Sequence, residues 1–185
     1  MEGKKIVCLG DSLTFGYPYG SKFSWVYYVA CRSSLEMINA GFSGNILEDM
    51  AKRYRKDVKR RSPDLLVVLG GTNDAYNPEV SCAESIFHLE KIINEALSDR
   101  IRPVIALPMP VIDDFAVDKL ERIRAEERDV ANRFNLSWFD FADAFTDPSG
   151  SIKEDLYLDG VHPNTAGYEA MGVVALAFFQ EFFQR

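Results

Sequence analysis

Ser12 is the residue of this chain best placed to act as a nucleophile. It follows the apolar run 6–9 and the pair Gly10-Asp11. An apolar run of this length that ends at a turn residue is typical of a buried strand, and ligands of open α/β sheets bind beyond the carboxyl ends of the strands. A serine hydroxyl is a weak nucleophile, so it needs a base for its proton and donors for the charge that develops on the substrate. The serine hypothesis therefore requires both parts elsewhere in the chain.

The candidate base is one of only two histidines. His88 lies within an amphipathic helical pattern, where a structural or surface role is expected. His162 follows Asp159 by three residues across a turn at Gly160, so the carboxylate can hold the imidazole Nδ1 and leave Nε2 for the serine proton. Taken alone, this pair also fits a helix cap or a metal site. Neither a second nearby histidine nor a cysteine cluster completes a metal site, so no metal or other cofactor is expected.

Two glycine-rich segments after the second and third predicted strands could supply an oxyanion hole. Gly44 could offer a backbone N–H at close approach because it has no Cβ. Asn73 could offer its side-chain amide, and the N–H of Ser12 at the start of a helix could be a third donor. Taken singly, each glycine or asparagine is more typical of an ordinary turn. All of them fall at the same edge of the predicted sheet, which favours the functional interpretation.

Four segments together resemble a known enzyme family. Gly10-Asp11-Ser12-Leu13 resembles the first block of the GDSL, or SGNH, hydrolases. Segments 39–44, 70–74 and 159–163 resemble three further blocks of that family and occur in the same order. The resemblance implies a flavodoxin-like three-layer α/β/α fold. It also implies a metal-independent hydrolase of esters or thioesters.

The resemblance further implies an acyl-transfer mechanism. Ser12 attacks the carbonyl carbon while His162, oriented by Asp159, takes its proton. The expected partner is a small-molecule ester or thioester, and neither its acyl group nor its alcohol follows from the sequence. The expected oxyanion donors are the N–H groups of Ser12 and Gly44 and the side chain of Asn73, and the carboxylates expected to brace these loops are Asp11 and Asp74.

The elements that must position these residues alternate strictly between strand and helix. Strand signals lie at 4–9, 36–39, 65–69, 103–107 and 137–141, and helical patterns lie at about 23–34, 46–61, 82–98, 115–134 and 165–183. This alternation predicts a five-stranded parallel sheet with helices on both faces, an α/β fold. No repeat or low-complexity linker divides the chain, so a single domain over residues 1–185 is expected.

The composition disfavours several classes of partner and location. Lysine and arginine total 21 against 28 acidic residues, a net charge of −7, which does not favour binding to nucleic acid or anionic membranes. The basic residues within 52–61 fall at helical spacing and are interpreted as a solvated helix face. No run approaches the ~20 apolar residues of a membrane helix. Three widely spaced cysteines fit reduced thiols and a cytoplasmic protein.

The last helical pattern bears on the oligomeric state. Positions 175, 178, 179, 182 and 183 form one apolar stripe, most simply a face turned toward the core. An exposed remainder of this stripe would favour a homodimer, so monomer and homodimer both stay open.

A different functional class also stays open. A nucleotide- or phosphate-binding module could have the same doubly wound shape without hydrolase activity. Gly10, Gly16 and Gly20 are too widely spaced for the dinucleotide fingerprint, and the chain has no Gly-Lys-Ser/Thr phosphate loop. This alternative is therefore the weaker of the two.

Overall fold

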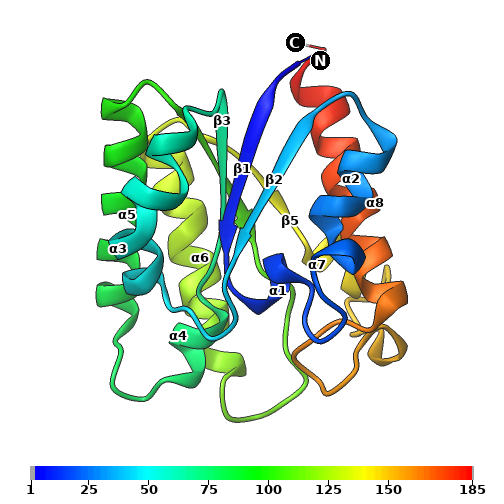
Figure 1. Ribbon diagram of the computed structural model, residues 1–185. Helices are drawn as coiled ribbons and strands as arrows, with labels where there is room; N and C mark the ends of the chain where they lie inside the picture. Colours follow the sequence, from blue (N-terminus) through cyan, green and yellow to red (C-terminus); the bar gives the residue numbers. More distant parts are fainter. Residues whose placement is uncertain (1–2, 185) are drawn as a thin grey trace.

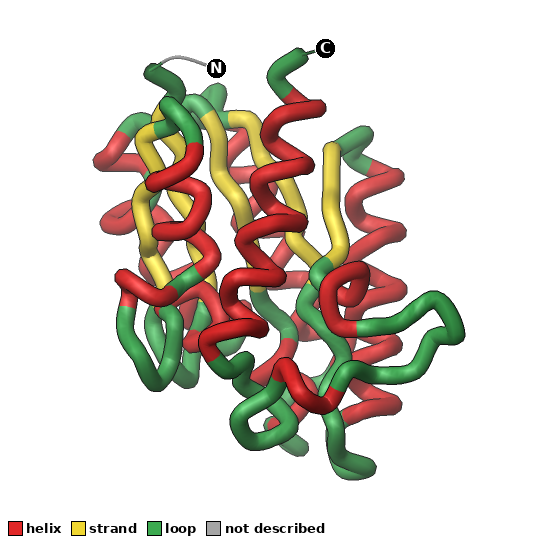
Figure 2. Tube along the Cα trace, turned by 90° about the vertical axis from the view of Figure 1, so that its right-hand side faces the viewer, coloured by secondary structure: helices red, strands yellow, loops and turns green. Residues whose placement is uncertain are grey.

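The computed structural model describes residues 3–184 of the chain. At its centre is a parallel sheet with helices on both faces (Figures 1 and 2). The strands are β1 (Lys5–Gly10), β2 (Glu36–Gly41), β3 (Leu65–Leu69), β4 (Arg102–Leu107) and β5 (Ser137–Asp140). They lie in the order β2-β1-β3-β4-β5, the flavodoxin-like order of doubly wound folds. The expected three-layer α/β/α fold with a five-stranded parallel sheet is confirmed.

The long helices form the two outer layers (Figure 1). One face carries α2 (Trp25–Arg32) and α8 (Thr165–Phe182), and the other carries α3 (Leu47–Asp57), α5 (Cys82–Ser98) and α6 (Val117–Arg133). The shorter elements are α1 (Ser12–Phe15), α4 (Thr72–Tyr76), α7 (Ala142–Phe145) and the 3₁₀ turns η1 (Ser21–Phe23), η2 (Lys59–Arg61) and η3 (Glu154–Leu156). Within residues 3–184, no helix combines the length and the apolar content that crossing a membrane requires.

Strand β1 shows why the apolar run before the serine becomes a central strand. Its side chains point alternately to the two faces of the sheet. Ile6 and Cys8 pack in the core on the α2–α8 side, whereas Val7 and Leu9 pack in the core on the α3–α5–α6 side. Both edges of β1 are hydrogen-bonded, one to β2 and the other to β3. The carboxyl end of β1, and the residues just beyond it, therefore have a fixed position.

Some helices begin or end at other residues than the helical period predicts, because a local cap or turn sets the end. The helix expected at 23–34 begins at Trp25, because the Ser24 side chain caps it by accepting from Tyr27 N at 3.2 Å. The helix expected at 46–61 ends at Asp57 and continues only as the η2 turn. The short helices α4 and α7 were not predicted, and α1 was expected only as a helix start at Ser12, because four or five residues are too few to show a helical period.

The apolar stripe of α8 packs on the core, as expected. Ala175 and Phe179 are fully buried. Phe178, Phe182 and Phe183 are half-buried against the same core, and the Arg102 guanidinium lies 5.5 Å from the centre of the Phe182 ring. The phenylalanines of this helix therefore complete the core on the α2–α8 side. The choice between monomer and homodimer stays a prediction.

Candidate active site

The nucleophile candidate lies at the topological switch point of the sheet. The chain leaves β1 toward β2 on one side and returns to β3 on the other, and ligands of open α/β sheets bind beyond the carboxyl ends of the strands at such a point. Ser12 is the first residue of α1, directly after β1. Asp11 caps that helix by accepting from Leu13 N at 2.9 Å, and Gly16 closes the turn with φ of +97°. Local capping thus fixes the orientation of the serine.

The structure brings Ser12 together with the Asp-His pair from the other end of the chain. Ser12 Oγ lies 3.1 Å from His162 Nε2, and His162 Nδ1 lies 2.8 Å from Asp159 Oδ2. An Nδ1–H that donates to the carboxylate leaves Nε2 free to accept the serine proton. The three side chains therefore have the connectivity of a nucleophile, a base and an orienting acid.

Asp159 also organises the loop that carries the histidine. Its Oδ1 accepts from the backbone N–H groups of Val161 at 3.0 Å and His162 at 2.7 Å. Gly160 takes φ of +84° in this turn, and its carbonyl accepts from Ile112 N at 2.8 Å. Partial burial would raise the pKa of Asp159, but the hydrogen bonds from His162 and Val161 outweigh it and hold this pKa below its ordinary value. Asp159 is therefore a stable carboxylate beside the imidazole.

Tyrosine side chains support the histidine and the serine. The Tyr17 ring packs against the His162 ring with the centroids 4.7 Å apart. The buried hydroxyl of Tyr168 donates to the carbonyl of Tyr17 at 2.8 Å and also contacts the carbonyl of Ser12 at 3.4 Å. Tyr168 therefore links α8 to the stretch 12–17, whose Tyr17 ring packs against His162.

The three expected oxyanion donors lie at this edge of the sheet. They differ in whether their N–H groups already have an acceptor. Within residues 3–184, the N–H groups of Ser12 and Gly44 donate to no acceptor. Gly44 is exposed and takes φ of +83°, a conformation that favours glycine. The Asn73 amide is already engaged, because Nδ2 donates to Asn45 O at 3.0 Å and to Asp11 Oδ2 at 3.3 Å.

Asp11 and Asp74, the carboxylates predicted to brace these loops, are both buried. Asp74 accepts from Leu47 N at 3.1 Å and so ties the start of α3 to α4. Burial raises the pKa of Asp11 to about 7 and raises that of Asp74 as well. Glu127 of α6 is also fully buried, and its burial raises its pKa well above the ordinary value. The site therefore rests on a layer of buried carboxyl groups.

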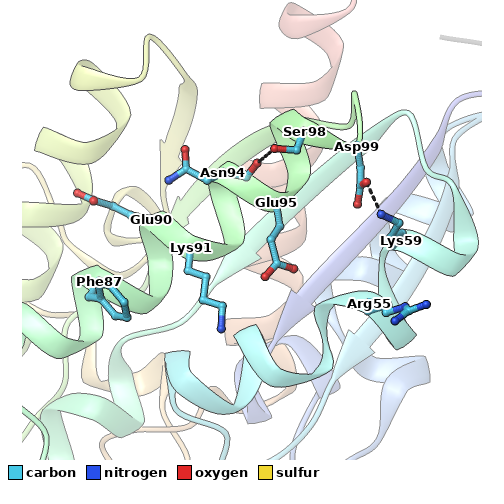
Figure 3. Close-up of a pocket in the computed structure, with 9 residues that line it drawn as sticks. All are labelled: Arg55, Lys59, Phe87, Glu90, Lys91, Asn94, Glu95, Ser98 and Asp99. Carbon is cyan, nitrogen blue, oxygen red and sulfur yellow. Dashed lines mark hydrogen bonds and ion pairs between the residues drawn. The ribbon is translucent and has the colours of Figure 1, made fainter.

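Other candidate positions do not join this site. His88 is half-buried on α5, next to the Phe87 ring. In residues 3–184, no group of three histidine, cysteine, aspartate or glutamate side chains is arranged to hold a metal ion. A groove between α3 and α5 has mixed charges, including a Lys59–Asp99 ion pair at 2.6 Å (Figure 3). None of the predicted site residues lines that groove.

Arg53 is a site residue that the sequence interpretation missed. The basic segment 52–61 was expected to be a solvated helix face, and Lys52, Arg55 and Lys56 are indeed exposed. For Arg53 that interpretation is wrong, because its half-buried guanidinium donates hydrogen bonds to carbonyl groups at the ends of β1 and β2. Helical spacing could not reveal this, since the acceptors belong to strands far away in the sequence.

Comparison with known proteins shows the family of this chain. A model of the GDSL-like lipase/acylhydrolase family matches residues 8–170. The lipoprotein YqeF of Bacillus subtilis (strain 168) is 31% identical over 120 residues, which is 58% of this chain and 49% of that protein. The chain thus matches about half the length of this relative.

Solved structures show the same architecture over nearly the whole chain. A G-D-S-L family protein from Desulfitobacterium hafniense DCB-2 superimposes with a TM-score of 0.87 and 29% identity, covering 95% of this chain and 99% of that one. A lipase/acylhydrolase from Enterococcus faecalis gives a TM-score of 0.83 and 28% identity, with 96% of each chain covered. With the family model spanning most of its length, the chain belongs to the GDSL-like lipase/acylhydrolase family of ester-hydrolysing enzymes.

Proposed function

We propose that this chain hydrolyses carboxylic esters or thioesters of small molecules through an acyl-enzyme intermediate on Ser12. The observation that carries the proposal is the continuous chain of contacts from Ser12 Oγ to His162 Nε2 at 3.1 Å and from His162 Nδ1 to Asp159 Oδ2 at 2.8 Å. Both distances lie within the range in which a base can take a proton and an acid can orient that base.

The mechanism follows from these contacts. Ser12 Oγ attacks the carbonyl carbon as its proton passes to His162 Nε2, while Asp159 stabilises the imidazolium through Nδ1. His162 then returns the proton to the leaving alcohol or thiol as the bond to the acyl carbon breaks. Water, deprotonated by the same imidazole, releases the acyl group and restores the serine. Apart from water, each step uses only groups of the chain and of the substrate.

The oxyanion hole of this mechanism needs a rearrangement at Asn73. The N–H groups of Ser12 and Gly44 are available, whereas both hydrogens of the Asn73 amide have acceptors. The contact with Asp11 Oδ2 is the longer, at 3.3 Å against 3.0 Å for Asn45 O. We infer that Asn73 exchanges this weaker contact for the substrate oxyanion and keeps Asn45 O as its anchor. The amide then gains a stronger acceptor only when charge develops, which favours the transition state.

Replacing Asn73 with alanine is expected to lower kcat by about 10²–10³-fold and leave KM nearly unchanged, the loss typical of one oxyanion donor. The measurement is steady-state hydrolysis of p-nitrophenyl acetate. Asn77→Ala is the matched control, since Asn77 lies just after the same short helix and its side chain caps only Glu79 N. A rise in KM with normal kcat would instead make Asn73 a substrate-binding residue.

The proposed function is tested by following the first turnover. Rapid mixing with p-nitrophenyl acetate should release a burst of nitrophenol proportional to the enzyme concentration, and the protein should carry one acetyl group on Ser12 by mass spectrometry. Incubation with EDTA should leave the rate unchanged, because the chain supplies every proposed group. Loss of activity to EDTA that a divalent cation restores would contradict the proposal. Nucleotide binding without esterase activity would support the phosphate-binding alternative.

A further inference from the structure

Arg53 differs from the basic residues beside it on α3. Its side chain is 16% exposed, whereas that of Lys52 is 61% exposed. A guanidinium that is largely withdrawn from water is costly unless its charge and its N–H groups are satisfied. The contacts that satisfy it therefore indicate what this side chain does.

The guanidinium makes four hydrogen bonds to two strand ends, one loop and its own helix. The ion pair with Asp57, one turn further along α3, balances its charge. The acceptors are Gly10 O at 2.6 Å from Nη2, Ala40 O at 2.8 Å from Nη1, Asn45 Oδ1 at 2.6 Å from Nε and Asp57 Oδ2 at 2.9 Å from Nη1. Two of these bonds therefore hold the ends of β1 and β2, and a third holds the loop after β2 that carries Gly44.

Each oxyanion donor is close to one of these acceptors. Gly10 precedes the Ser12 N–H by two residues along the chain. Asn45 directly follows Gly44, and its carbonyl accepts from Asn73 Nδ2 at 3.0 Å. One guanidinium therefore bonds to two of the segments whose donors must converge on a single oxygen atom. Asn45 links it to the third segment through Asn73.

We propose that Arg53 is a positioning residue that sets the spacing of the oxyanion hole by clamping the ends of β1 and β2 and the Asn45 side chain. The inference rests on the proposed function, because it assigns Arg53 a role in the same acyl transfer. Arg53 touches no reacting atom and acts only through the strand ends and the Asn45 side chain that it holds. The spacing matters because donors stabilise an oxyanion only when they lie about 2.7–3.1 Å from it.

The chemistry of the contacts explains why arginine is required here. Three acceptors in different directions match the planar guanidinium, which has five N–H groups in a fixed fork. Lysine carries the same charge on one nitrogen and cannot reach three acceptors held by separate segments. Arg53→Lys therefore keeps the charge of α3 but removes the clamp.

Arg53→Lys is expected to lower kcat for p-nitrophenyl acetate by roughly 10–10²-fold with KM within about 3-fold of wild type, because small displacements of catalytic groups are costly. The rate at which an alkyl phosphonate labels Ser12 should fall in parallel, since that reaction uses the same oxyanion donors. The assay is run well below the melting temperature of each variant, so that lost stability does not lower the rate.

The controls separate this role from a structural one. Arg55→Lys changes an exposed arginine of the same helix and should keep wild-type kcat. Asn45→Ala removes only the contact to Nε and should lower kcat by about 3–10-fold. It also serves as the test if Arg53→Lys does not fold.

Two results would overturn the inference. The first is a wild-type kcat in Arg53→Lys, or in Asn45→Ala if the lysine variant is unfolded. The second is a change in KM alone. Failure of the proposed function would look different. The wild-type protein would then give neither a burst nor a phosphonate adduct on Ser12, whatever the state of Arg53.

Discussion

Ser12→Ala is expected to abolish turnover, with kcat lowered on the order of 10⁴–10⁶-fold, because the proposed mechanism forms the acyl-enzyme on Ser12. The fold should persist, since the Ser12 hydroxyl contacts only His162 within residues 3–184 and α1 keeps its Asp11 cap. The measurement combines steady-state hydrolysis of p-nitrophenyl acetate with mass spectrometry after exposure to an alkyl phosphonate. The variant should gain no phosphonyl group.

The matched control is Ser34→Ala, an exposed serine just before β2. It should keep both activity and labelling, and all variants should retain the wild-type melting transition within a few degrees. Full phosphonate labelling of Ser12→Ala would place the nucleophile at another residue. A variant that is inactive and also unfolded would be compared with Ser12→Gly and Ser12→Cys, of which the cysteine form should still be labelled by thiol reagents.

Asp159→Asn is the second large effect, an expected loss of about 10³–10⁴-fold in kcat. The carboxylate accepts from His162 Nδ1, whereas an asparagine at this position can present its NH₂ group to that nitrogen. Nδ1 then becomes the acceptor, the proton moves to Nε2, and Nε2 can no longer take the proton of Ser12. The loop should survive, because the asparagine oxygen can still accept from the N–H groups that Asp159 Oδ1 now holds.

The pH dependence tests the same arrangement. Hydrogen bonds from His162 and Val161 hold the pKa of Asp159 below its ordinary value despite partial burial, so Asp159 is ionised at every pH from 5 upward. Losing that charge therefore requires strongly acidic conditions. The base must be neutral to act, and histidine side chains ordinarily titrate near ~6.5. A plot of kcat/KM against pH should thus rise between about pH 5 and 8 and then level off.

Asp155→Asn is the control for this profile, because Asp155 is an exposed acid of the η3 turn nearby. It should reproduce the wild-type curve. A wild-type profile that is flat from pH 5 to 8 would contradict the role of the imidazole as base. Equal activity of Asp159→Asn and wild type at pH 8 would contradict the role of the carboxylate.

The sheet and the long helices could be predicted from the sequence because their signals are local. Apolar runs such as Leu65–Leu69 and helical periods such as Cys82–Ser98 reappear at the expected residues. The ends of the elements depend on contacts that patterns do not show. The helix expected from residue 23 begins only at Trp25, because the Ser24 side chain caps it there. The four residues of α1 are too few to show a helical period.

The positions of the candidate site could also be predicted, but its hydrogen bonds could not. The residue types and the strand ends placed Ser12, Asn73 and His162 at one edge of the sheet, where the structure has them. The Asn73 amide already contacts Asn45 O and Asp11, which lie 28 and 62 residues away along the chain. The sequence pattern does not show these contacts. The inward turn of Arg53 depends in the same way on carbonyl groups of distant strands.

The distance along the chain between nucleophile and base has a consequence for biosynthesis. Ser12 and His162 are 150 positions apart, so at about 5–20 residues per second the serine leaves the ribosome roughly 8–30 s before its base. During that interval β1 also lacks α8, which covers one of its faces. A nascent chain that stops short of Asp159 carries the serine in an incomplete core and, in the proposed mechanism, has no base to take the serine proton. We therefore expect activity to appear late in translation. A measured rate of hydrolysis then reports only the chains that have been synthesised and folded through α8.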